Sequence, residues 1–199
     1  MALNDQEISW RCGLGPRNDA KYDYYRSNPM LDPFVAEKTK KGALSYGVGH
    51  FGYDIRLGYS VKVPRVSTQC GWIDPLEPET LSRQKFFNVS LEEVQHALKP
   101  GEFILAGTFE YFRMPSDLVA TVHDKSTLAR LGVAVQTTVL EPGWSGYLTM
   151  EITNHGVNTI MLSARMPIAQ VIFHQGNIPN QLYDGKYQNQ AYAEIARAD

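Results

Sequence analysis

Cysteine is scarce in this chain of 199 residues, which holds only Cys12 and Cys70, far apart and without a surrounding partner pattern. Two isolated cysteines predict no disulfide framework and favour a reducing compartment. The first ten residues lack the basic segment and apolar run of a signal peptide. No apolar run approaches the length needed to span a membrane, so we expect a cytoplasmic protein with no membrane partner.

An excess of charge is also missing. The formal net charge is -2, and the chain is 43% hydrophobic and 20% charged, which is ordinary for a soluble globular protein. No overall field favours nucleic acid or an anionic membrane, so we expect no nucleic-acid partner. A polyanionic ligand would have to meet a local cluster of basic groups instead.

Several common motifs are absent. The sequence has neither the H-x-E nor the P-C-x-x-C motif that zinc-dependent deaminases use to hold their metal. It also lacks the GxxxxGK[ST] and GxGxxG phosphate-binding patterns, and its five histidines are scattered. We therefore expect no zinc and no metal held by protein ligands, which leaves open a magnesium ion carried by the phosphates of a ligand.

Hydrophobic periodicity predicts a mainly β fold with a few short helices. Period-two segments separated by turn signals begin at Phe103, and they cover residues 103–112, 118–123, 131–140, 147–154, 159–164 and 169–175. Such a succession favours a β-sandwich, jelly roll or barrel. Strands and tight turns are also expected over residues 43–63, whereas residues 64–88 resemble a loop. We expect one domain over residues 1–199.

Extra segments flank that domain at both ends. Asn4 with Glu7 matches a capping box, which predicts a short helix ending near Gly13, followed by an irregular stretch over residues 14–32. The N-terminal arm thus covers about residues 1–42, and a flexible C-terminal lid covers about residues 183–199. A second capping box, Ser90 with Glu93, predicts another helix that residues 99–101 would end.

The segment 124–130 (DKSTLAR) gathers groups that suit a phosphate chain. Lys125 and Arg130 supply positive charge, and Ser126 and Thr127 supply hydroxyls at the expected start of a short helix, whose free N–H groups favour an anion. The alternative is a capped helix start with two solvated cations. Composition alone favours that alternative.

A second candidate is Glu151, in the middle of an expected strand. Alternation puts Tyr147, Thr149 and Glu151 on one face, and Leu148 and its alternate neighbours on the other. Glu151 lies either on an exposed strand face or in a pocket, where burial would raise its pKa and let it exchange protons near neutral pH. Periodicity does not choose between these alternatives.

Together, five segments resemble a known family. Residues 124–132 (DKSTLARLG) resemble an element shared by trimeric dUTPases and dCTP deaminases, and residues 51–58 (FGYDIRLG) resemble their early strand motif. Similar matches are residues 100–115, the EPGWSG turn at 141–146, and GKYQNQ at 185–190. Over about residues 43–190 the chain therefore resembles the dCTP deaminase family of the trimeric dUTPase-like superfamily.

The resemblance implies a distorted β-barrel or jelly roll of the dUTPase-like β-clip type, assembled as a homotrimer with active sites between subunits. It implies hydrolytic deamination of dCTP to dUTP and ammonia, with Mg²⁺ bound through the nucleotide phosphates and dTTP as a candidate inhibitor. Glu151 would activate the water, and Ser126 and Arg130 would hold it and balance charge. The implied substrate-binding residues are Lys125, Ser126, Thr127, Leu128, Ala129, Arg130, Gln136, Thr138, Val139, Glu141, Thr149, Met150, Glu151, Gln170, Tyr183, Lys186 and Gln190.

Glu151 separates the branches of this superfamily. The deaminase strand carries a glutamate three residues before an asparagine, as here, whereas the dUTPase strand is typically apolar at that place. Three alternatives stay open: a bifunctional deaminase and diphosphatase giving dUMP, a deaminase for a 5-substituted dCTP, and a catalytically silent nucleotide-binding regulator. The chain also departs from the family at Asp124, where glycine is usual, in its short loop 136–140, and in the tail after Gln190.

Overall fold

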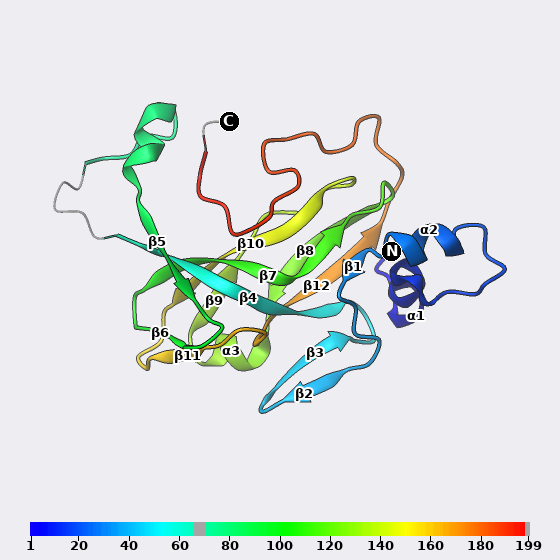
Figure 1. The fold of residues 1–199 in the computed structure, drawn as a ribbon, viewed down its shortest axis with the longest axis horizontal. Helices are drawn as coiled ribbons and strands as arrows, with labels where there is room; N and C mark the ends of the chain where they lie inside the picture. The colour runs from blue at the N-terminus through cyan, green and yellow to red at the C-terminus, as the bar shows by residue number, and fades with distance from the viewer. Residues whose placement is uncertain (66–70, 198–199) are drawn as a thin grey trace.

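The N-terminal arm folds into short helical segments beside a large sheet (Figure 1). The structure is a computed structural model that describes residues 1–65 and 71–197. The helical segments of the arm are α1 (Asp5–Ser9), the π-type turn η1 (Trp10–Leu14) and α2 (Tyr22–Ser27). The capping box is confirmed, because Asn4 Oδ1 accepts a hydrogen bond from Glu7 N at 2.9 Å and Glu7 Oε2 accepts one from Asn4 N at 3.0 Å.

A buried arginine fastens this arm to the sheet. Arg11 donates to both carboxylate oxygens of Asp117, at 3.0 and 2.8 Å, and to the Tyr25 hydroxyl at 2.9 Å. Burial alone would raise the pKa of Asp117, but the hydrogen bonds and charge of Arg11 outweigh it and lower that pKa. The arm is therefore held by a directional ion pair as well as by apolar packing.

Ten strands of the described chain form one curled sheet, as expected for a mainly β protein. Its continuous path runs β2-β3-β4-β7-β10-β9, while β12 joins β4 to β8, β5 pairs with β4, and β1 pairs with β7. The strands are β1 (Leu31–Asp32), β2 (Thr39–Lys41), β3 (Leu44–Val48), β4 (Tyr53–Pro64), β5 (Phe86–Ser90), β7 (Phe103–Arg113), β8 (Leu118–Asp124), β9 (Val133–Gln136), β10 (Ser145–Asn154) and β12 (Pro167–Gln175). A second, two-stranded sheet pairs β6 (His96–Leu98) with β11 (Ile160–Leu162).

Strand β10 follows the predicted alternation. Leu148, Met150 and Ile152 are buried, whereas Thr149 and Glu151 on the opposite face are half-buried. The buried face packs into a core that includes Tyr53 and other large side chains with no measurable exposure. One face of β10 thus stabilises the fold and leaves the other available for a site.

The helix predicted after Ser90 is wrong. The Leu91 amide instead donates to the Tyr59 carbonyl at 2.7 Å, which extends the pairing of β4 with β5. Leu98 lies in β6 and is fully buried, while Val94 is exposed, so the apolar residues at helical spacing do not share one buried face. Strand pairing and core burial outweighed the local capping signal.

The segments expected to be irregular hold more structure than predicted. Residues 14–32 include α2 and β1, and residues 64–88 include the 3₁₀ turn η2 (Pro78–Arg83) and the start of β5. Residues 66–70 of that second stretch lie outside the described residues, and so does Cys70. Cys12 is buried, and burial raises its pKa to about 12.

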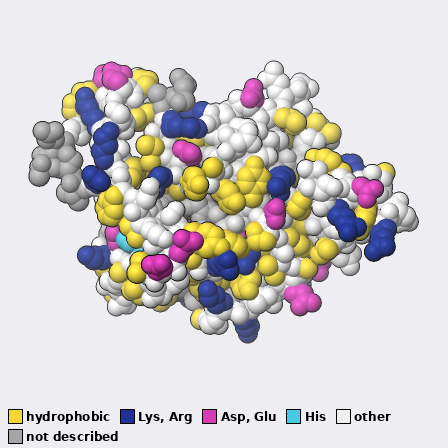
Figure 2. Space-filling model, viewed as in Figure 1, with side chains coloured by type: hydrophobic (Ala, Val, Ile, Leu, Met, Phe, Trp, Pro, Cys, Tyr) yellow, Lys and Arg dark blue, Asp and Glu magenta, His cyan; other side chains and the backbone are white. Residues whose placement is uncertain are grey.

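Charges of both signs share the surface. Figure 2 shows Lys and Arg side chains lying among Asp and Glu side chains on one face, as the small net charge suggests. Among the described residues, the structure has no helix with the length and apolar character that crossing a membrane requires.

Candidate functional site

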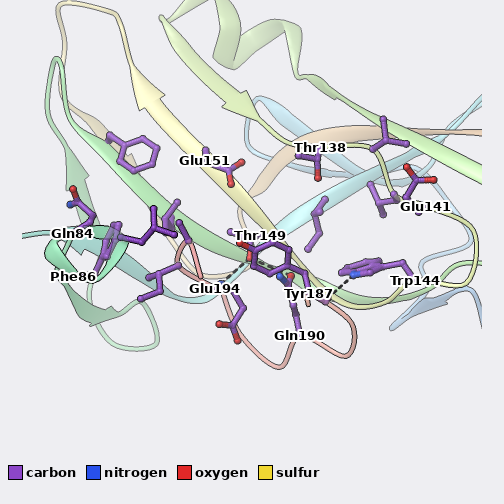
Figure 3. Close-up of a pocket in the computed structure, with 18 of the residues that line it drawn as sticks. Gln84, Phe86, Thr138, Glu141, Trp144, Thr149, Glu151, Tyr187, Gln190 and Glu194 are labelled. Carbon is purple, nitrogen blue, oxygen red and sulfur yellow. Dashed lines mark hydrogen bonds between the residues drawn. The ribbon is translucent and has the colours of Figure 1, made fainter. Parts of the chain in front are cut away.

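Strands β7, β9 and β10 bring Glu151 into the floor of a cavity. In the antiparallel register, Glu151 lies opposite Leu105 of β7 and opposite Gln136 of β9. The cavity has a volume of about 630 Å³, within the usual range for small-molecule sites. In Figure 3 the Glu151 carboxylate lies between Gln84 and Phe86 on one side and Thr138 on the other.

The C-terminal tail forms another wall of this cavity. The Trp144 indole donates to the Tyr187 carbonyl at 2.7 Å, and the Tyr147 amide donates to the Gln190 carbonyl at 2.9 Å. Further along, the Glu194 amide donates to the Thr149 hydroxyl at 2.9 Å (Figure 3). The tail is therefore fastened to the 140–146 turn and to β10, beside Glu151.

Burial changes the chemistry of Glu151. Removal of the side chain from water raises the pKa of Glu151 above its ordinary value of 4.5, and a hydrogen bond within the same residue offsets this only in part. Of the alternatives that periodicity left open, the geometry matches the carboxylate in a pocket. A carboxyl group with a raised pKa can both accept and donate a proton near neutral pH.

A second cavity of about 260 Å³ surrounds the DKST segment at the end of β8. Lys125, Ser126 and Thr127 line it, together with Ser45 of β3 and Gln170 of β12. The expected short helix is present as α3 (Ser126–Arg130), and it begins immediately after Lys125. Three hydroxyl side chains and the lysines Lys38 and Lys125 thus line a common space.

Asp54 orients the lysine of this second cavity. Lys125 Nζ lies 2.8 Å from Asp54 Oδ2, and the two side chains are only 10% and 4% exposed. The Ser45 hydroxyl donates to the same oxygen at 3.0 Å, and Lys38 Nζ lies 3.9 Å away. The Lys125 charge is therefore held in place and partly compensated before any anion arrives.

Asp124, where glycine is expected, has a structural partner. Its Oδ1 accepts a hydrogen bond from the Val135 amide at 2.8 Å, which joins the end of β8 to β9. The carboxylate also borders the second cavity. Its negative charge is thus partly engaged by a backbone dipole.

The residues implied by the family resemblance fall into three groups. The Glu151 cavity is lined by Thr138, Val139, Glu141, Thr149, Glu151, Tyr183 and Gln190. The second cavity is lined by Lys125, Ser126, Thr127 and Gln170. Neither cavity is lined by Leu128, Ala129, Arg130, Gln136, Met150 or Lys186.

Members of the third group lie in different surroundings. Leu128 and Met150 are buried in the core, whereas Arg130 is exposed and donates to the Ser126 carbonyl at 3.2 Å. Within one chain, the structure therefore separates Glu151 from the segment that carries Ser126 and Arg130.

Sequence reasoning missed part of the cavity lining. Phe86, Leu81 and Gln84 come from the stretch that resembles a loop in sequence, and Ile195 comes from the atypical tail. A signal existed for Trp144 in the 141–146 turn, for Tyr187 in the 185–190 segment, and for Phe103 and Leu105 in the 100–115 segment, which the resemblance identified. Tertiary contacts of the other residues carry no local pattern.

Comparison with known proteins gives consistent matches. A family model described as dCTP deaminase-like matches residues 32–176. The dCTP deaminase of Herpetosiphon aurantiacus is 35% identical over 173 residues, covering 84% of this chain and 90% of that protein. The dCTP deaminase of Campylobacter fetus subsp. fetus is 38% identical over 176 residues, covering 85% and 90%.

A solved structure supports the fold. The 2'-deoxycytidine 5'-triphosphate deaminase from Agrobacterium tumefaciens matches 88% of this chain with a TM-score of 0.58 and 18% identity. This chain spans about half, 48%, of the length of that chain. At this identity the likeness concerns the fold, and it agrees with the expected mainly β architecture.

Proposed function

Because this chain belongs to the dCTP deaminase-like family, we propose that it is an enzyme that hydrolyses dCTP to dUTP and ammonia. The names of its relatives support this reaction. The observation that carries the proposal is Glu151, a half-buried carboxylate with a raised pKa in a cavity of sufficient size for a nucleotide base.

The reaction needs one group that moves protons. Glu151 accepts a proton from water while the water oxygen bonds to C4 of cytosine, which gives a tetrahedral intermediate. Glu151 then passes the proton to the amino group, the C4–N bond breaks, and ammonia leaves. The proton that remains on the C4 hydroxyl moves to N3, which gives uracil. Such acid–base catalysis contributes about 10²- to 10⁴-fold, and it requires no zinc in this scheme.

The separation of the two cavities favours active sites between subunits. We propose a homotrimer in which Glu151 of one subunit meets Ser126 and Arg130 of a neighbour. The exposed Arg130 side chain is available for such a contact. Closed symmetry repeats the same contact three times, so each trimer has three equivalent sites.

In this arrangement, Lys125, Ser126 and Thr127 bind the phosphate chain. Among residues 1–65 and 71–197, no three His, Cys, Asp or Glu side chains gather to hold a metal. A Mg²⁺ ion would therefore arrive on the phosphates, where it neutralises part of their charge. We also propose that the tail from about residue 183 acts as a lid. Its hydrogen bonds to Trp144 and Thr149 support this role. We further propose that the arm over about residues 1–42 belongs to the same domain.

Product analysis tests the reaction. Purified protein is incubated with each deoxynucleoside triphosphate and Mg²⁺, and the products are identified by mass together with an ammonia assay. We expect dUTP and one ammonia per dCTP. Binding of dCTP without ammonia release would contradict the proposal and favour a regulator, and release of dUMP with pyrophosphate would identify a bifunctional enzyme.

Subunit mixing tests the shared site. Glu151→Gln and Arg130→Ala are each expected to be inactive as pure trimers. Random mixing of equal amounts puts an intact Glu151 next to an intact Arg130 in about one site in four, so about a quarter of the activity returns. The control mixes Arg130→Ala with Ser126→Ala, which damage the same half-site and should restore nothing. No recovery in the first mixture would place the whole site within one chain.

A further inference from the structure

The cavity around Glu151 continues beyond the space needed for an unsubstituted cytosine. On the side of Gln84 and Phe86 in Figure 3, the lining consists mostly of apolar side chains. The strand register groups the apolar side chains around Phe86, because Phe86 of β5 pairs with Pro64 of β4, and Leu105 of β7 pairs with Lys62 of the same strand β4. We name this part the apolar bay, which consists of Pro64, Leu81, Phe86, Phe103 and Leu105. Gln84 contributes an exposed amide to the same part of the lining.

Specific contacts order the segment that carries Leu81. Leu81 lies on η2, which Thr80 anchors: its buried hydroxyl donates to the Asp74 carbonyl at 2.8 Å and accepts from the Asp74 amide at 3.0 Å. Arg83 stacks over the Trp72 ring at 4.5 Å and donates to the Trp72 carbonyl at 2.8 Å. These contacts brace the 72–83 segment that carries Leu81.

Pyrimidine geometry decides which part of a substrate reaches the bay. In cytosine, C4 lies across the ring from N1, which carries the sugar. The tail residue Gln190 and the polar side chains Thr138 and Glu141 lie on the cavity side away from the bay, where the sugar and phosphates are expected. With C4 at Glu151, either the C5 edge or the N3 edge of the ring faces the bay. The N3 acceptor would lose its hydrogen bond to water against apolar side chains, so the C5 edge is the one that fits the bay.

We propose that the apolar bay receives an apolar substituent at C5 of the pyrimidine, so that the substrate class includes 5-substituted deoxycytidine nucleotides. This inference rests on the proposed deamination at Glu151 and extends it. A C5 hydrogen leaves an apolar space unfilled, whereas a short carbon chain removes apolar surface from water on both partners. Side chains from three strands and η2 make the bay specific for shape.

The experiment compares dCTP, 5-methyl-dCTP and 5-propynyl-dCTP by ammonia release. We expect kcat/KM to rise about fourfold for the methyl group, the effect of burying one carbon, and at least about tenfold for the propynyl group. Leu81 is half-buried, so the larger side chain of Leu81→Trp should fill the bay. We expect the ratio of kcat/KM for 5-propynyl-dCTP to kcat/KM for dCTP to fall at least about tenfold in this variant. The intrinsic reactivity of each base is the same for every variant, so this ratio isolates the bay.

Leu76→Trp is the matched control, because Leu76 is 90% exposed, precedes the same turn and does not line the cavity. It should leave the ratio unchanged. Rejection of 5-propynyl-dCTP by an enzyme that deaminates dCTP would overturn the bay as a substituent site, as would occupation of the bay by a neighbouring subunit. The bay would also be overturned as a substituent site if Leu81→Trp and the parent had the same ratio of kcat/KM for 5-propynyl-dCTP to kcat/KM for dCTP. If none of the three nucleotides released ammonia, the result would instead contradict the proposed function.

Discussion

Replacement of Glu151 by glutamine tests the proton-transfer role most directly. Glutamine keeps the shape of the side chain and removes only its ability to ionise. Loss of acid–base catalysis by one group costs about 10²- to 10⁴-fold in rate, or about 3–5 kcal/mol of transition-state stabilisation at 1.36 kcal/mol per tenfold. We therefore expect kcat for ammonia release to fall by at least about 100-fold, while dCTP binding changes little.

The same substitution should not weaken the fold. Because burial raises the pKa of Glu151, this group contributes stability below its unfolded pKa and loses that contribution as pH rises through its folded pKa. The ionised carboxylate is therefore a net cost to the fold, which Glu151→Gln removes at pH values above the folded pKa. Urea unfolding at pH 7 should find the variant at least as stable as the parent, so its inactivity would not result from unfolding.

The pH profile supplies a second test of the same group. A general base must be deprotonated in the free enzyme, so the acid limb of kcat/KM should fall at a pH above 4.5, the ordinary value for glutamate. Two other carboxylates, Glu141 and Glu194, line the cavity and serve as comparison variants. Near-normal turnover in Glu151→Gln, combined with a 100-fold loss in Glu141→Gln or Glu194→Gln, would refute the assigned role.

Three further substitutions test the frame of the site. Asp54→Asn leaves the Lys125 charge without its partner at 2.8 Å and should lower the free energy of unfolding by about 3 kcal/mol, measured by urea titration; an unchanged midpoint would contradict this. Gly132→Ala puts a Cβ 2.4 Å from a backbone nitrogen at φ +89°, so thermal melting should fall by several degrees or soluble protein should be lost; a normal melting temperature would disprove the close packing. Asp117→Asn removes the Arg11 ion pair, whose stabilisation is present above the unfolded pKa of about 3.9 and lost as pH falls through the lowered folded pKa; parent and variant should differ at pH 7 and converge in acid, and a constant difference would argue against that assignment.

Local patterns in the sequence were sufficient for most strands. The alternation of Leu148, Met150 and Ile152 with half-buried neighbours is a repeat of two, and the structure reproduces it. The Asn4 and Glu7 capping box is equally local and was confirmed. The signal after Ser90 failed because its energy is small compared with pairing β6 to β11 and burying Leu98.

The candidate site was only partly predictable, because it joins distant segments. A family resemblance identified Glu151 and the DKST segment, but neither pattern indicates that they border separate cavities in one chain. The contribution of Leu81 and Ile195 depends on how η2 and the tail fold back onto the sheet. Such contacts are set by the whole structure, and short-range periodicity does not encode them.

Strand β10 pairs on both edges, with β7 and β9, and its inward side chains belong to the core. Its inner amide protons can therefore exchange with deuterium only when the sheet opens cooperatively, whereas the tail holding Gln190 and Glu194 can detach in a smaller event. Glu151, the proposed proton carrier, thus lies on a strand that is paired along both edges, beside a tail that we expect to exchange its amide protons faster. Local detachment of the tail would let nucleotides enter and leave the cavity without moving the Glu151 carboxylate.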